Sequence, residues 1–302
     1  MKSAGARPIV AEVIGGPEEQ VVYQMVLDYV ESWYSGDAAQ MERALHPELA
    51  KRFFRDFPSG ARFLEEAGAS KLIQWTASGG GRSIPSAHQR REVTVLDVFF
   101  RAAVVKVVTA TGAEYVQLGK FGTDWKIINI LGEPRTGAPF ALPLSSSYPE
   151  GRQAPVVDDP RVGDAGRDYG EGWNTADQSR VDRVIHPQWS KKCVQVTQAG
   201  GFFLESWGAE KMSRWTASAE HQADRHGKGL EEVRVTVLDQ GREIAAVKVA
   251  WDIDSQGQAG SVDYLSLAKA DDRWRAVNIL WQDDRSHGDD PINEAGAAGW
   301  IL

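Results

Sequence analysis

Two histidines and one aspartate are the candidates that we single out for moving a proton. His46 and His186 each precede a proline at the end of an apolar helical pattern, and Asp56 precedes Phe57-Pro58. An imidazole or a carboxyl group held in a pocket can act as a general acid or base. Each also has a structural interpretation, because the helix dipole favours a histidine at a helix C-terminus and aspartate is common in loops. Both interpretations stay open at this point.

A second group of residues could hold a flat ligand. Tryptophan and tyrosine combine a large apolar surface with one polar atom, and a buried phenol or amide must find a hydrogen-bond partner. For Trp33 and Trp173 we favour core packing. The candidate ligand-binding residues are Tyr29, Trp33, Trp75, Tyr115, Asn129, Tyr169, Trp173, Trp215, Tyr264 and Asn278.

The amide of Asn129 is the most informative member of this group. Strand alternation predicts that Asn129 shares one face with Trp125, Ile127 and Leu131. An amide on an otherwise apolar face binds either a neighbouring backbone group or a ligand.

Other reactive residue types give weaker indications. Asp97 and Asp239 end β-rich runs and are predicted to fix hairpin turns. Cys193 is predicted to be a small core residue. Segment 221–226 holds two histidines and an aspartate without a helical i, i+4 spacing, so we predict no metal site. No phosphate-cradling glycine motif is present, and no cofactor is expected.

Composition limits the classes of partner. The chain has 302 residues with a formal net charge of -8, which argues against nucleic-acid and membrane surfaces. No apolar run is long enough to span a bilayer, and the N-terminus lacks the apolar core of a signal peptide. The single cysteine excludes an intrachain disulfide, so a cytoplasmic location is expected. The eleven tryptophans are unusual and suggest an aromatic core or pocket.

An internal repeat organises all of these residues. Corresponding segments follow one another in the same order, and the interval between them grows only where loops lengthen. They are 29–37 with 169–177, 63–78 with 203–218, 93–97 with 235–239, and 115–131 with 264–280. We therefore predict a first domain over 1–132, a Pro/Gly/Ser-rich linker over 133–157, a second domain over 158–284 and a polar tail over 285–302.

The sequence of each copy predicts helices followed by strands. Pro17 starts a long amphipathic helix that Gly36 ends. Asp37 is predicted to cap a second helix, which stops at 46–47, and a third short helix is predicted around 70–75. Short connections between strands predict an antiparallel meander and an α+β domain, with helices on one face of a curved sheet forming an open cone. The predicted strands are 92–99, 102–109, 114–121 and 125–131.

Segments 29–37, 41–52 and 263–269 resemble the NTF2-like superfamily, in particular its branch described as putative lumazine-binding and the related SnoaL-like polyketide cyclases. This resemblance implies two tandem cone domains. Asp56 lies near the position where isomerase-like relatives place a catalytic carboxylate. The second copy offers no acid there, since 191–196 reads Lys-Lys-Cys-Val-Gln-Val, so catalysis by Asp56 would confine activity to the first copy.

The resemblance also implies a function and an assembly. Many relatives pair two sheets face to face as dimers, so the two copies are expected to pair within this chain as a pseudo-dimer. The first hypothesis is a cofactor-independent enzyme of small-molecule, secondary metabolism, acting by acid/base chemistry on an apolar or aromatic substrate in the manner of cyclases, isomerases or dehydratases. Its weakness is that we identify no acid–base pair in both copies. The alternatives are a non-catalytic binding protein for an aromatic small molecule and a structural partner protein.

Overall fold

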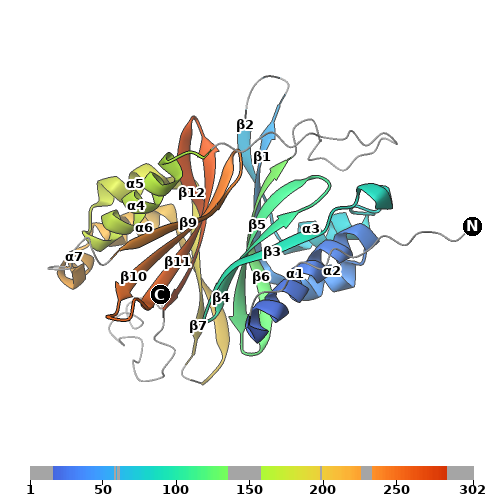
Figure 1. Ribbon diagram of the computed structural model, residues 1–302. Coiled ribbons are helices and arrows are strands. Elements are labelled where there is room, and N and C mark those ends of the chain that lie inside the picture. The colour runs from blue at the N-terminus through green and yellow to red at the C-terminus, as the bar shows by residue number, and fades with distance from the viewer. Residues whose placement is uncertain are drawn as a thin grey trace, which may run out of the picture.

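The computed structural model describes residues 16–57, 59, 62–134, 158–197, 199–225 and 233–283. The predicted linker, apart from its first two residues, and the predicted C-terminal tail lie outside these ranges. Within them the chain forms two successive α+β units with the same order of elements, as the repeat predicts (Figure 1).

The first unit begins with helices whose ends follow from local sequence. Pro17 opens the first helix with two acids in its first turn, and Gly36 ends it at φ 73°, where its N–H donates to the Ser32 carbonyl. The Asp37 side chain caps the second helix by accepting from the Gln40 N–H at 2.9 Å. The elements are α1 (Pro17–Ser35), α2 (Ala38–Ala44), β1 (Leu45–Asp56), β2 (Arg62–Ala67), α3 (Ala69–Ala77), the 3₁₀ helix η1 (Ser86–His88), β3 (Glu92–Phe99), β4 (Ala102–Val108), β5 (Gly112–Phe121) and β6 (Asp124–Pro134).

The second unit repeats this plan. Asp177 caps its second helix as Asp37 does in the first unit, and one short helix, α7, is added after the third helix. The elements are α4 (Arg161–Asn174), α5 (Gln178–Val184), β7 (Ile185–Val196), β8 (Phe202–Gly208), α6 (Ala209–Thr216), α7 (Ala219–Arg225), β9 (Arg234–Gln240), β10 (Ile244–Ile253), β11 (Ala259–Ala270) and β12 (Arg273–Asp283).

Each sheet has six strands, of which the sequence predicted four. The orders are β2-β1-β6-β5-β4-β3 and β8-β7-β12-β11-β10-β9. The predicted strands form the antiparallel run, whereas β1 joins β6 in parallel and pairs with β2 antiparallel. The prediction missed β1 and β2 because β1 contains a proline and charged residues, Lys51 and Arg52, that are buried only by contacts with distant segments.

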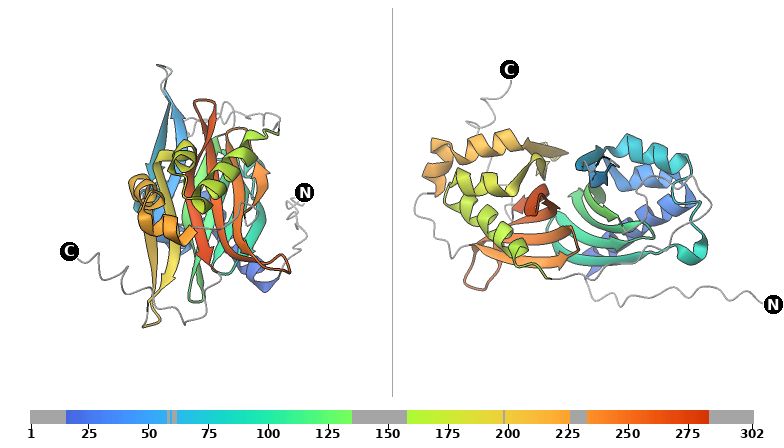
Figure 2. Two further views of the ribbon diagram at one scale, coloured as in Figure 1. Left: turned by 90° about the vertical axis from the view of Figure 1, so that its left-hand side faces the viewer. Right: turned by 90° about the horizontal axis from the view of Figure 1, so that it is seen from above.

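The two sheets lie face to face and the helices cover their outer faces (Figures 1 and 2). One apolar core lies between helices and sheet in each unit. A third core lies between the sheets and draws on both units, with Phe54, Tyr115 and Ile128 from the first and Val194, Tyr264 from the second among its members. The inner face of each cone is therefore separate from the contact between the two units.

Polar contacts also cross between the sheets. Arg52 donates to the Ser190 hydroxyl and the Val277 carbonyl, each at 3.0 Å. The Lys192 ammonium donates to the Glu48 carbonyl at 2.6 Å. Buried donors need acceptors, and these acceptors come from the opposite unit. The Arg52 guanidinium also pairs with Glu66 of its own unit at 2.6 Å, and its Nε has no acceptor among the described residues.

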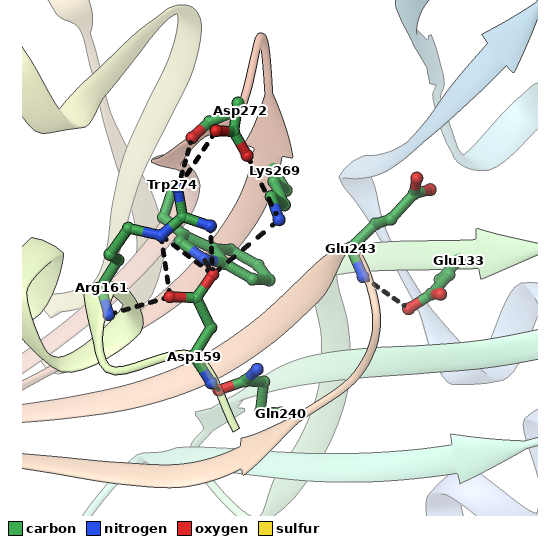
Figure 3. Close-up of polar contacts among 8 residues, drawn as sticks. All are labelled: Glu133, Asp159, Arg161, Gln240, Glu243, Lys269, Asp272 and Trp274. Carbon is green, nitrogen blue, oxygen red and sulfur yellow. Dashed lines mark hydrogen bonds and ion pairs between the residues drawn. The ribbon is translucent and has the colours of Figure 1, made fainter. Parts of the chain in front are cut away.

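A carboxylate at the start of the first helix ties that helix to the last hairpin of its own sheet. In the second unit Asp159 accepts from the Trp274 indole N–H at 3.0 Å and from Arg161, and lies 3.8 Å from the Lys269 ammonium (Figure 3). The hydrogen bonds from Arg161 hold the pKa of Asp159 well below its usual range. In the first unit Glu18 has the same role toward Trp125 and Lys120. The helix layer is thus held over the sheet in the same way in both copies.

Candidate ligand site

A pocket of about 170 Å³ opens on the inner face of the second cone. It lies against the first helix of the unit and five of its strands. Its walls are mainly indole rings, and its polar groups are one ammonium, one hydroxyl and three carboxylates. The lining residues are Trp173, Lys191, Trp207, Trp251, Asp252, Ser261, Asp263, Trp281 and Asp283.

The tryptophans are held by contacts with one another and with polar neighbours. The Trp207 and Trp281 rings meet edge to face, with centroids 6.1 Å apart, and the Trp207 N–H donates to Glu205 at 2.6 Å. Trp251 packs edge-on against Tyr169 at 6.1 Å. The Trp251 indole N–H is buried and has no hydrogen-bond acceptor among the described residues. Fixed aromatic faces of this kind suit a flat or cationic ligand.

A buried charged triad lies beside these rings. The Lys191 ammonium lies 2.6 Å from Asp263 and donates to the Tyr169 hydroxyl at 3.0 Å, while that hydroxyl donates to Asp263 at 2.5 Å. Burial raises the pKa of Asp263, and the charge of Lys191 opposes this rise. Burial and the nearby Asp263 charge raise the pKa of Tyr169 well above its ordinary value, so its hydroxyl stays protonated at neutral pH.

The first copy contains the same triad. Lys51 lies 2.5 Å from Glu114 and donates to the Tyr29 hydroxyl at 2.9 Å, and this hydroxyl donates to Glu114 at 2.9 Å. The expectation that no acid–base pair recurs in both copies was therefore wrong. A signal was present in the sequence, because an acid stands immediately before the matched tyrosines Tyr115 and Tyr264.

The pocket walls, by contrast, differ between the copies. Strand registers give the counterparts directly: Trp207 pairs with Lys191 as Ala67 pairs with Lys51, and Trp281 pairs with Asp263 as Gly132 pairs with Glu114. Three indoles of the second cone thus stand where the first has small side chains. The counterparts, second copy first, are Trp207 and Ala67, Trp251 and Thr109, Ser261 and Gly112, Trp281 and Gly132, and Asp283 and Pro134.

Tyr34 lies close to the matching wall of the first cone. Tyr34 and Ile84 are both buried in its core. The Tyr34 hydroxyl donates to the Arg90 carbonyl at 2.9 Å and accepts from the Ala110 N–H at 3.0 Å. Ala110 directly follows Thr109, the counterpart of Trp251, so Tyr34 contacts the part of the first cone that corresponds to this wall of the pocket.

The predicted ligand-binding residues separate into two groups. Trp173 lines the pocket and Tyr169 belongs to the adjoining triad, whereas Tyr29 and Trp33 pack in the first cone. Trp75 packs against that same core. Trp215 is 40% exposed and meets Trp207 edge-on at 6.0 Å, outside the pocket lining.

Tyr115, Tyr264 and the two asparagines lie elsewhere, between the sheets. The Asn129 amide donates to Gln117 at 2.9 Å, and Gln117 donates to the Tyr264 carbonyl of the other unit at 2.8 Å. The prediction that Asn129 shares a face with Trp125 was wrong. A β-bulge between the pairings of Gln117 and Leu118 inserts one extra residue into β6, which reverses the inward and outward alternation from that point.

Asn278 follows the same pattern in the second sheet. The register of β11 and β12 shifts between Ser266 and Leu267, and the Asn278 amide donates to the Ile130 carbonyl of the first unit at 3.4 Å. The Asn278 oxygen accepts from Arg52. Asn278 is therefore a direct polar contact between the copies, whereas Asn129 reaches the other copy only through Gln117. Both asparagines lie outside the pocket lining.

Both predicted catalytic histidines stand at the start of a strand. The Nδ1 atom of His46 accepts from the Glu48 N–H and that of His186 from the Gln188 N–H, each at 3.1 Å. Burial lowers the pKa of both imidazoles, which favours the neutral, accepting form. Neither residue is part of the pocket lining. Asp56 ends β1, and its side chain lies outside the described part of the structure.

The other candidate residues are engaged in contacts that support the fold. Asp97 and Asp239, predicted to fix hairpins, instead accept hydrogen bonds from tyrosines of the opposite unit. Cys193 is buried, and burial raises the pKa of its thiol well above the ordinary value. The His221 ring packs on Trp173 with centroids 4.2 Å apart. Within the described ranges, no three His, Cys, Asp or Glu side chains gather as a metal site. None of the helices in that part has the length and apolar character needed to cross a bilayer.

Comparison with known proteins identifies relatives of both units. A family model described as "Putative lumazine-binding" matches residues 17–131 and again 158–282. No curated protein is similar enough to count as a match. Among solved structures, an NTF-2 like protein of unknown function from Silicibacter pomeroyi is 13% identical, with 39% of this chain and 96% of that chain covered at a TM-score of 0.32. An NTF2-like protein from Methylobacillus flagellatus is 16% identical, with 41% and 96% covered at 0.33.

Proposed function

Because the chain belongs to the putative lumazine-binding family of NTF2-like proteins, in two tandem copies, we propose that it binds a small aromatic molecule in the pocket of its second copy. The observation that carries this proposal is the set of three indoles, Trp207, Trp251 and Trp281, at positions where the first copy has alanine, threonine and glycine. Residues common to both copies support the fold, whereas these three tryptophans occur only in the second copy, where they line the pocket.

The pocket dimensions narrow the ligand class. Its volume of about 170 Å³ lies below the roughly 300–1,000 Å³ typical of sites for drug-sized ligands. One or two fused rings fit better than the polycyclic substrate suggested by the cyclase resemblance. The family description names lumazine, a two-ring heteroaromatic, which is a suitable first probe.

The second candidate function is acid/base catalysis of a cyclase, isomerase or dehydratase type. It is favoured by Lys191 and Asp263, which line the pocket and could exchange a proton with a bound molecule. Against it stands the same triad in the first copy, where Tyr34 is packed within the cone. A pair that recurs in the copy without the three indoles is explained by its contribution to the fold, so we rank binding above catalysis.

We also propose that the two copies act as a fused counterpart of an NTF2-like dimer. The shared core between the sheets supports this, as do the donors of Arg52 and Lys192 that find acceptors in the opposite unit. In this proposal the first copy serves as scaffold and the second keeps the ligand site.

Binding can be tested by calorimetry and thermal shift with lumazine and other two-ring heteroaromatics. The variant Trp207→Ala introduces the residue found at the matching position of the first copy. We expect it to weaken binding by about tenfold or more, since base–aromatic stacking is worth roughly 1–3 kcal/mol. Trp75→Ala, on α3 of the first copy, is the matched control and should retain binding.

Two results would contradict the proposal: no two-ring heteroaromatic binds, or Trp207→Ala binds as tightly as the wild type. Catalysis is separated from binding by mass spectrometry of the ligand after incubation. Conversion of the ligand by wild-type protein, lost in Asp263→Asn while the variant stays folded, would favour the enzyme hypothesis instead.

A further inference from the structure

The Lys191 ammonium offers an unused hydrogen-bond donor to the second-cone pocket. An ammonium carries three N–H groups. Two of them are used, one toward Asp263 at 2.6 Å and one toward the Tyr169 hydroxyl at 3.0 Å. No other acceptor within the described part of the chain contacts Lys191, and its Nζ atom lies 5.0 Å and 5.2 Å from the ring centroids of Trp173 and Trp281. Both rings line the pocket, so the third N–H is open to an acceptor that a ligand brings.

The Asp283 side chain offers an unused acceptor to the same pocket. One of its carboxylate oxygens accepts from the Ser261 hydroxyl at 2.9 Å, and both residues line the pocket. The other oxygen accepts no hydrogen bond from the residues that the structure describes. Ser261 therefore fixes one oxygen of the carboxylate and leaves the other oxygen to an N–H group of a ligand.

Strand register places this donor and this acceptor side by side. Ser261 and Asp263 are two residues apart on β11, so their side chains lie on the same face of the sheet. Across to β12, Ser261 pairs with Asp283 and Asp263 pairs with Trp281. Asp263 and Asp283 are thus diagonal neighbours, with Cα atoms roughly 7–8 Å apart. Because the Lys191 ammonium lies 2.6 Å from Asp263, its free N–H and the free oxygen of Asp283 open on the same part of the pocket wall.

The acceptor occurs only in the second copy, whereas the donor occurs in both. Lys51 makes the same two kinds of hydrogen bond in the first copy. The counterparts of Ser261 and Asp283 are Gly112 and Pro134, neither of which has a side-chain acceptor. The first copy forms the same six-stranded sheet without this carboxylate, so the fold does not require it. The carboxylate accompanies the three pocket indoles, which favours a role in recognising the ligand.

We infer that the pocket recognises a lactam edge, a ring N–H beside a ring carbonyl, on a small fused-ring heteroaromatic ligand. The ligand N–H donates to Asp283 and the ligand carbonyl accepts from Lys191, while the rings stack on the indoles. A ligand with only one of these groups leaves a protein donor or acceptor buried without a partner, which costs more than a typical hydrogen bond contributes. This inference rests on the proposed function and adds the polar group that the ligand must carry.

The test compares three quinolinones of similar size. 2-Quinolinone has its N–H and carbonyl on adjacent ring atoms, and 4-quinolinone is an isomer with the two groups on opposite sides of the ring. N-methyl-2-quinolinone keeps the carbonyl and lacks the N–H. Titration calorimetry with the full chain should give a dissociation constant for 2-quinolinone about tenfold lower than for either of the others, because each of these loses a hydrogen bond to a charged group.

Two variants separate the hydrogen bond from the bulk of the added methyl group. Asp283→Leu removes the acceptor and keeps a side chain of similar size. It should bind 2-quinolinone and N-methyl-2-quinolinone equally. Asp182→Leu makes the same change at an exposed position of α5 in the same unit and should keep the wild-type preference.

The outcomes distinguish the lactam inference from the proposed function. Equal or tighter binding of 4-quinolinone or N-methyl-2-quinolinone by the wild type overturns the inference and leaves the proposed function intact. The same holds if Asp283→Leu keeps the full preference, because steric bulk then explains it. If lumazine binds and none of the quinolinones does, a lactam edge is insufficient and the inference fails. Failure of all three quinolinones together with lumazine overturns the proposed function itself.

Discussion

The Tyr115 hydroxyl of the first unit donates to the Asp239 carboxylate of the second at 2.5 Å. The relationship is reciprocal, because the Tyr264 hydroxyl of the second unit donates to Asp97 of the first at the same distance. Each aspartate also pairs with a lysine of its partner unit: Lys106 lies 2.6 Å from Asp239, and Lys248 lies 2.6 Å from Asp97. Two tyrosines that the sequence suggested for ligand binding thus link the two copies.

The first prediction concerns this link. Tyr115→Phe removes a hydroxyl that is bonded to a carboxylate and should lower the free energy of unfolding by about 1–2 kcal/mol. Tyr264→Phe should have the same effect because its contacts are equivalent. Urea unfolding followed by far-UV circular dichroism measures both. Tyr23→Phe is the control, since the Tyr23 hydroxyl has no hydrogen-bond partner within the described residues; equal losses in all three variants would argue against a specific contribution.

The second prediction concerns the recurring triads. Lys191→Met leaves the Asp263 carboxylate buried without its counter-charge and should cost roughly 3–5 kcal/mol. Lys51→Met should cost a similar amount through Glu114. Comparable losses measured by chemical unfolding indicate a role in the fold of each copy. A marked loss in Lys51→Met with none in Lys191→Met would instead show that the second-copy lysine is retained for the pocket.

The third prediction concerns pH. Burial, with the nearby Arg52 charge, lowers the pKa of Lys192 to about 8. Between this value and the ordinary value of 10.5 the unfolded chain binds more protons than the folded chain, so the contribution of Lys192 to stability rises with pH. From pH 7 to pH 9 this gain should be roughly 1 kcal/mol.

The measurement is a difference, because other groups titrate in the same range. Cys193 has a raised pKa and therefore lowers stability as its unfolded form ionises. Lys192→Met keeps Cys193 and removes the ammonium, so subtracting its unfolding free energies at pH 7 and 9 from those of the wild type isolates Lys192. Parallel pH profiles for the two proteins would refute the assignment.

The fourth prediction concerns the histidines. His46→Ala and His186→Ala each remove an acceptor for a backbone N–H at the start of a strand and should cost about 0.5–1.5 kcal/mol. Because neither residue lines the second-cone pocket, the dissociation constant of any ligand bound there should change less than twofold. Calorimetry on both variants checks this, and a large loss of affinity in His186→Ala alone would return that residue to the candidate catalytic set.

Local signals in the sequence predicted much of the fold. Pro17, Gly36 and Asp37 act on their own neighbours, so the ends of α1 and the start of α2 could be predicted without knowledge of the rest of the chain. The strand runs around Val104 and Val116 were equally clear, because apolar β-branched residues recur between short turns.

The site was harder to predict because its residues depend on distant partners. Lys191 resembles a surface residue in sequence, and only β11 and α4 bring Asp263 and Tyr169 to it. The side of the sheet on which Asn129 lies depended on a single bulge in β6, which a strict alternation of period two does not anticipate. Pairing of β1 with β6 likewise joins segments that lie far apart in the chain.

The sequence by itself determined that the protein is a duplication of one α+β unit, since matched tyrosines, tryptophans and caps recur in order whatever their surroundings. The tertiary structure alone decided what each matched residue contacts. Tyr169 lies within a cone and Tyr264 between the sheets, although both are buried tyrosines that recur in the two copies. The physical reason is that the type of each side chain is read directly from the sequence. The burial and the partners of a polar group, by contrast, depend on strand register and on the packing of one sheet against the other.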